Sequence, residues 1–110
     1  MKTLSEIDEQ INDIASAKYS DEKAKKRARK QLEFLRLCKK YLETQPSKEF
    51  VQKELDSLYN RVQHLDDACD YYIKNNPAYA NEPNPITRYK KEMDYSSLSN
   101  QIKTLKFLLQ

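Results

Sequence analysis

The chain has 110 residues, of which 34% are charged and 38% hydrophobic, and its formal net charge is +3. This length and balance predict one small, water-soluble domain. The sequence contains no glycine, which argues against phosphate-cradling loops, dinucleotide fingerprints and nucleophile elbows, and so against most kinds of enzyme site.

A first helix is predicted near the N-terminus, where apolar residues recur at spacings of three and four: Leu4, Ile7, Ile11 and Ile14. Thr3 or Ser5 precedes Glu6 and Asp8 in the arrangement of a capping box. The first residues turn acidic at once and no long apolar run follows anywhere. We therefore expect neither a cleavable signal sequence nor a membrane-spanning helix.

The segment around residues 18–22 allows two interpretations. The apolar pattern can be continued through it, which would make residues 3–44 one long helix. Alternatively, Ser20 followed by two acidic residues is a good N-cap for a second helix. Lys18 and Asp21 would both interrupt an apolar seam, so we favour a break.

Two longer helices, over about residues 20–44 and 47–75, are predicted to form an antiparallel helical hairpin. Pro46 ends the first helix and Ser47 can cap the second. The second helix carries an unbroken heptad seam, typical of a coiled coil: Val51, Leu55, Leu58, Val62, Leu65, Cys69 and Tyr72. Folding about Pro46 would cover this seam with the first helix, placing Ala24 opposite Cys69. The alternative is a homodimer through the same seam.

The rest of the chain is predicted to be a loop and a C-terminal helix. Asparagines before Pro77 should end the second hairpin helix in a left-handed cap, and residues 76–85 should form a loop without regular structure. A last helix is expected over about 86–109, with a kink or a new cap near 94–97. The fold class is therefore all-α, a three- or four-helix bundle over a single domain, 1–110.

The end of the chain is apolar, at Phe107, Leu108 and Leu109. We expect this last turn either to tuck into the bundle or to meet a second subunit, so that the C-terminal helix could form a homo-oligomer.

A basic run lies in the first hairpin helix, at Lys23, Lys25, Lys26, Arg27, Arg29 and Lys30. Such a run can bind the phosphates of nucleic acid, with little base preference. It can also be an ordinary solvated face, here partly neutralised by Asp66, Asp67 and Asp70 if the hairpin forms as predicted.

Tyrosines dominate the aromatic residues, and several of them flank the loop together with an arginine: Tyr71, Tyr72, Tyr79, Arg88, Tyr89 and Tyr95. Tyrosine and arginine are frequent in binding hot spots, which makes this set a candidate protein-binding surface. The set could equally stack on bases, or cap the end of the bundle with its hydroxyls in water.

Residues for chemistry are few. The single histidine, His64, is too far around its helix from Cys69 to form a dyad, and Cys38 lies elsewhere. We therefore expect no catalytic, cofactor-binding or metal-binding residues. The two cysteines should be too far apart for a disulfide, which favours a reducing compartment, the cytosol or the nucleus; we expect a cytoplasmic location.

The leading functional hypothesis is a small non-enzymatic protein-interaction module, an adaptor, assembly factor or inhibitor, which binds a protein partner through the tyrosine-rich end. Its composition suits an AT-rich bacterial or phage genome, so a phage-encoded inhibitor is included. The alternative is electrostatic binding of nucleic acid or a nucleotide by the basic residues 23–30.

Overall fold

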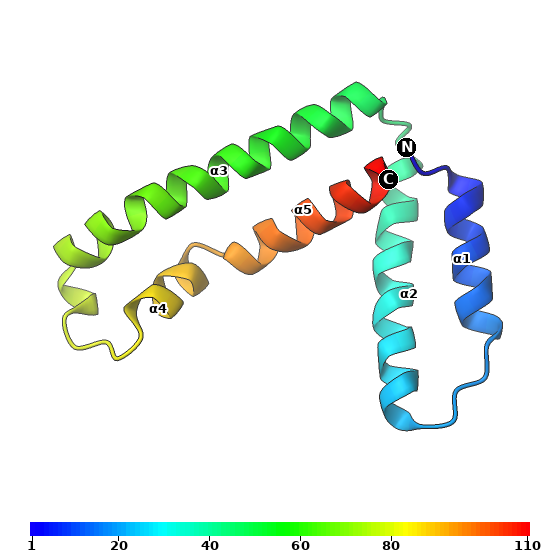
Figure 1. The fold of residues 1–110 in the computed structure, drawn as a ribbon, viewed down its shortest axis with the longest axis horizontal. Helices are drawn as coiled ribbons and strands as arrows, with labels where there is room; N and C mark the ends of the chain where they lie inside the picture. The colour runs from blue at the N-terminus through cyan, green and yellow to red at the C-terminus, as the bar shows by residue number, and fades with distance from the viewer. The chain divides into compact units, whose positions relative to one another are not determined.

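The computed structural model describes all of residues 1–110 and contains helices without strands. In chain order the elements are α1 (Leu4–Ser16), α2 (Glu22–Leu42), α3 (Lys48–Asn75), the short 3₁₀ helix η1 (Pro77–Tyr79), α4 (Pro85–Glu92) and α5 (Tyr95–Leu109) (Figure 1). The predicted all-α class is confirmed, and α1 contacts α2 as in a helical hairpin. The predicted hairpin of residues 20–44 and 47–75 spans two compact units of the chain and stays a prediction. No helix combines the length and apolar character needed to cross a membrane.

The chain forms two compact units. The first, unit 1, comprises residues 1–51 and 106–110, and the second, unit 2, comprises residues 52–105. That both units fold together as the single predicted domain stays a prediction. It can be examined by whether unfolding is one cooperative transition.

In unit 1, α1 and α2 lie side by side and run antiparallel (Figure 1). The predicted break between them is confirmed, but its cap is Asp21 and not Ser20: the Ala24 backbone N–H donates to the Asp21 carboxylate at 2.7 Å. Asp21 is the N-cap because its backbone is extended, which directs its carboxylate back at the first turn of α2. At the start of α1, Thr3 accepts from the Glu6 N–H at 3.2 Å, as the capping box predicts.

The core of unit 1 joins both ends of the chain. Leu108 is completely buried, and the Lys2 backbone N–H donates to its carbonyl oxygen at 2.7 Å. Phe107 meets Phe34 edge to face, with ring centroids 5.3 Å apart. The last turn of α5 therefore tucks in, the first of the two expected outcomes. The buried residues of this core are Ile7, Leu35, Cys38, Leu42 and Leu108.

In unit 2, α3 from residue 52 onwards supports the loop, α4 and the first turns of α5. The buried residues at this end are Cys69, Tyr79 and Tyr89, with Ile73, Met93 and Tyr95 packed against them. Leu98 and Leu105 are buried further along α5. The register predicted between Ala24 and Cys69 joins residues of different units and stays a prediction. Within unit 2, Cys69 packs in one buried cluster with Tyr79 and Tyr89.

Two details of the loop differ from the prediction. Asn76 has φ −107° and is not left-handed; its side chain instead accepts from the Ala78 N–H at 3.0 Å and starts η1. The segment 76–85 therefore contains a 3₁₀ turn that we did not expect. The left-handed residues are Gln45, after α2, and Asp94, with φ 54° and 56°. Asp94 makes the predicted break in the C-terminal helix, which divides it into α4 and α5.

Candidate functional site

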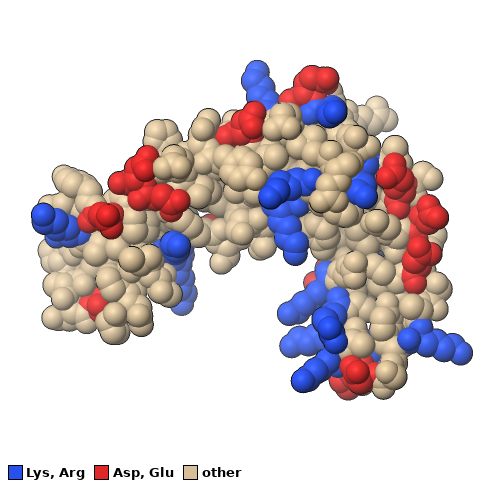
Figure 2. All heavy atoms as spheres, in the orientation of Figure 1, with Lys and Arg blue, Asp and Glu red and all other residues tan.

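The basic run predicted as a nucleic-acid site lies on the exposed surface of α2. All six of its residues are exposed. One of them, Lys25, makes an ion pair with Glu22, at 3.4 Å, and both of these side chains remain largely in solvent. The other five have no acidic partner within unit 1. Figure 2 shows Lys and Arg side chains gathered along α2 on the side away from α1.

The basic surface also continues past the predicted run. Lys25, Arg29, Arg36 and Lys40 are spaced by four, seven and four residues, which places them along one stripe of a helix. Arg36 and Lys40 are exposed as well. We did not include these two in the predicted site, although the same spacing rule could have found them. We call the six predicted residues together with Arg36 and Lys40 the basic face of α2; at 3.6 residues per turn they spread over about half of the helix circumference, so that no single stripe contains all of them.

The acidic residues of α1 make no ion pair with the basic residues in the first turns of α2. α1 carries acidic residues and no lysine or arginine, and Asp8 pairs with Lys39 at 2.8 Å, near the C-terminal end of α2. The N-terminal half of α2 extends beyond the end of α1 (Figure 1). The positive side chains there lie near the positive end of the helix dipole, which Asp21 and Glu22 neutralise in part.

The predicted tyrosine surface is largely a packed cluster. Ring centroids of Tyr72 lie 5.7 Å from Tyr79 and 5.5 Å from Tyr89, and Tyr89 lies 6.2 Å from Tyr95. Tyr79 and Tyr89 are 3% and 1% exposed, whereas Tyr71 is 74% exposed and lies outside the cluster. The structure thus brings together four of the five predicted tyrosines, but it buries two of them, Tyr79 and Tyr89.

The hydroxyls of the cluster bind protein groups. Tyr89 donates to the Leu65 carbonyl and Tyr95 to the Asp66 carboxylate, both at 2.9 Å, while Tyr79 donates to Glu92. Burial, with the bond to Glu92, raises the pKa of Tyr79 to about 12. Because the rings pack on one another and these three hydroxyls bond to protein groups, the cluster holds together the end of unit 2 that carries the loop.

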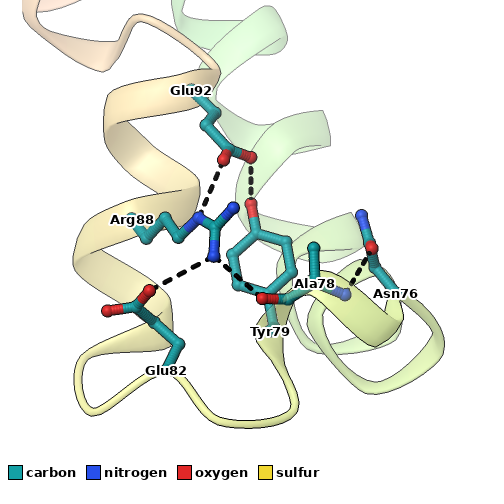
Figure 3. Close-up of polar contacts among 6 residues, drawn as sticks. All are labelled: Asn76, Ala78, Tyr79, Glu82, Arg88 and Glu92. Carbon is teal, nitrogen blue, oxygen red and sulfur yellow. Dashed lines mark hydrogen bonds and ion pairs between the residues drawn. The ribbon is translucent and has the colours of Figure 1, made fainter.

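Arg88, also predicted to bind a partner, is held within unit 2. Its guanidinium bonds to Glu92 at 2.9 Å, to the Ala78 carbonyl at 2.8 Å and to Glu82 at 3.2 Å. It also lies 5.1 Å from the centre of the Tyr79 ring. Figure 3 shows this arginine between the loop and α4, with Glu92 bridging it to Tyr79. Arg88 therefore anchors the loop to α4.

The Glu92 carboxylate should make this anchor sensitive to acid. The Tyr79 hydroxyl and then the Arg88 guanidinium lower the pKa of Glu92 below its usual value. Because the folded-state pKa is the lower one, this contribution to stability is present above the unfolded-state pKa and is lost as the pH falls through the folded-state pKa. We expect Glu92→Gln to lose less stability than the wild type between about pH 6 and about pH 3.

The urea midpoint at each pH measures that difference. The matched control is Asp70→Asn, which removes an exposed carboxylate of the same unit. An acid-induced loss as large in Glu92→Gln as in the wild type would contradict the assignment.

The structure offers little for catalysis. No group of three or more His, Cys, Asp or Glu side chains is placed to hold a metal ion. Both cysteines are free and buried, and burial raises the pKa of Cys38 to about 11, which keeps the thiol in its unreactive form. His64 is exposed. That the protein has no catalytic, cofactor or metal site stays a prediction.

Comparisons with known proteins add no assignment: no protein-family model, no curated protein and no solved structure matches this chain.

Proposed function

We propose that the protein binds double-stranded nucleic acid without sequence preference, through phosphate contacts from the basic face of α2. The observation that carries the proposal is the set of exposed lysines and arginines in residues 23–30 that have no acidic partner within unit 1. Neutralising phosphates with such residues releases counterions, which supplies most of the free energy of non-specific binding.

The shape of the basic face favours a duplex. From Lys23 to Lys40 the helix spans about 25 Å at 1.5 Å per residue, which matches about seven base-pair steps of 3.4 Å. Single strands are held by exposed aromatic side chains on which bases stack. The aromatic residues of α2, Phe34 and Tyr41, instead pack against the core of unit 1.

The experiment is a titration of a fluorescently labelled duplex of about 20 base pairs, followed by anisotropy. With four to six phosphate contacts, we expect the logarithm of the association constant to fall with the logarithm of the salt concentration with a slope of about −4 to −5. Two duplexes of unrelated sequence should bind alike. Absence of binding at low salt, or a strong preference for one sequence, would contradict the proposal.

A second candidate function is binding of a protein partner, the leading hypothesis from the sequence. It is supported by the exposure of Tyr71 and, in part, of Tyr72, which are adjacent near the end of α3. A photo-crosslinking residue at position 71 should capture one defined partner from the native host, whereas the same residue at the exposed position Tyr59 should not. Equal capture at both positions would count against a tyrosine-end interface. A homo-oligomer that uses this same surface would appear in the experiment as a crosslinked dimer.

A further inference from the structure

A groove separates α4 from α5 in unit 2. The bend at Asp94, with φ 56°, redirects the chain between the two helices, and the Asp94 carboxylate caps α5 by accepting from the Ser97 N–H at 3.4 Å. The space left beside α3 has a volume of about 870 Å³. This is within the range of about 300–1,000 Å³ that is usual for small-molecule sites.

Polar residues of both helices line this groove in a regular way. Positions i, i+3 and i+4 share one face of a helix, and each of the two helices supplies one such triplet of polar residues to the groove. The triplets are Thr87, Lys90 and Lys91 from α4, and Ser96, Ser99 and Asn100 from α5. Each helix therefore turns a polar face towards the same space.

The chemistry of the lining favours an anion with an apolar part. The lining contains two ammonium groups and several hydroxyl or amide donors. It contains one carboxylate, that of Asp94, which already accepts a hydrogen bond from the Ser97 N–H. Lys90 lies 5.6 Å from the centre of the Tyr95 ring, a cation–π contact that holds its ammonium group beside the groove. The apolar part of the lining consists of Val62 and Ile102, with the Tyr95 ring beside them.

We propose that this groove binds a small organic phosphate ester. The phosphate lies between Lys90 and Lys91, where charge-assisted hydrogen bonds are strongest, and it accepts further bonds from the hydroxyl and amide groups of α5. The organic part rests on Val62 and Ile102. The site lies in unit 2 and is independent of the basic face of α2, so either proposal can fail without the other.

Phenyl phosphate is a suitable probe because it combines both chemical features. We expect it to bind with a one-to-one stoichiometry by calorimetry, and to shift the backbone amide resonances of Ser96, Ser99 and Asn100. Phenol, which lacks the phosphate, and inorganic phosphate, which lacks the ring, should each bind at least about tenfold more weakly, a difference of about 1.4 kcal/mol.

Matched variants locate the site. Lys90→Gln with Lys91→Gln should weaken phenyl phosphate binding by about tenfold or more, whereas Lys53→Gln with Lys74→Gln, which removes the same charge from exposed positions of unit 2, should leave it unchanged. Ser99→Leu, which fills the groove without altering charge, should also abolish binding. Equal affinity in all variants, tighter binding of phenol, or no binding at millimolar probe would each overturn the proposal.

Discussion

Replacing Leu108 with alanine should destabilise the protein by about 2–5 kcal/mol, the usual cost of truncating a buried leucine. Leu108 is 0% exposed and packs in the core that α1 and α2 share. The truncation removes apolar contacts and leaves a cavity that the neighbouring helices can close only in part. Urea unfolding followed by circular dichroism measures the change.

Leu37→Ala is the matched control for this prediction. Leu37 lies on α2 in the same unit but is 63% exposed, so its truncation should change the free energy of unfolding by about 0.5 kcal/mol or less. If the two variants lost similar amounts of stability, the last turn of α5 would not be part of the core. A single transition in the wild type would also support the single predicted domain.

Reversing four charges on α2 should weaken duplex binding by more than about 100-fold at moderate salt. The variant changes Lys25, Lys26, Arg29 and Lys30 to glutamate. It removes about four phosphate contacts and adds repulsion, and even the loss of counterion release from four contacts has an effect of this size. The slope of affinity against salt should become shallower as well. Anisotropy at two salt concentrations measures both quantities.

A control variant separates a local site from overall charge. Glutamates at Lys53, Arg61, Lys74 and Lys106 reverse the same number of positive charges at exposed positions outside α2. This variant should retain most of the affinity and most of the salt slope. If it lost as much as the α2 variant, binding would depend on net charge and the basic face would have no special role. Circular dichroism of both variants shows whether they remain folded.

Helix boundaries could be predicted because they depend on nearby residues. Thr3 and Ser47 cap helices through bonds to the N–H groups three residues on, and Pro77 blocks continuation of α3. The break near Asp94 was also visible as a change in the apolar pattern. Each of these signals is complete within one turn of helix, so no knowledge of the tertiary fold was needed.

The residues that cover Cys69 within unit 2 could not be predicted in the same way. A heptad seam states that a face is apolar, but it does not specify which helix covers it. The neighbours of Cys69 prove to be Tyr79 and Tyr89, whose hydroxyls can be buried because they bond to Glu92 and to the Leu65 carbonyl. These acceptors are distant in sequence, so the pattern around each tyrosine gave no sign that it would be internal.

The basic face could be predicted in composition but not in extent. The run over residues 23–30 is obvious in the sequence, and its exposure in the structure agrees with either a solvated or a phosphate-binding face. What the structure adds is that α1 ends before it reaches this segment and that Arg36 and Lys40, which the helical spacing alone places on the stripe, are exposed. Neither the end of α1 nor this exposure follows from counting charges.

The most direct test of the phosphate-binding role of α2 is a titration of the isotopically labelled protein with a short duplex at low salt, followed by its backbone amide resonances. We expect the largest shifts and broadening to fall within residues 23–40 and to disappear as salt is raised. Perturbations confined to the tyrosine-rich end around residues 71–95, or no perturbation at low salt, would contradict it.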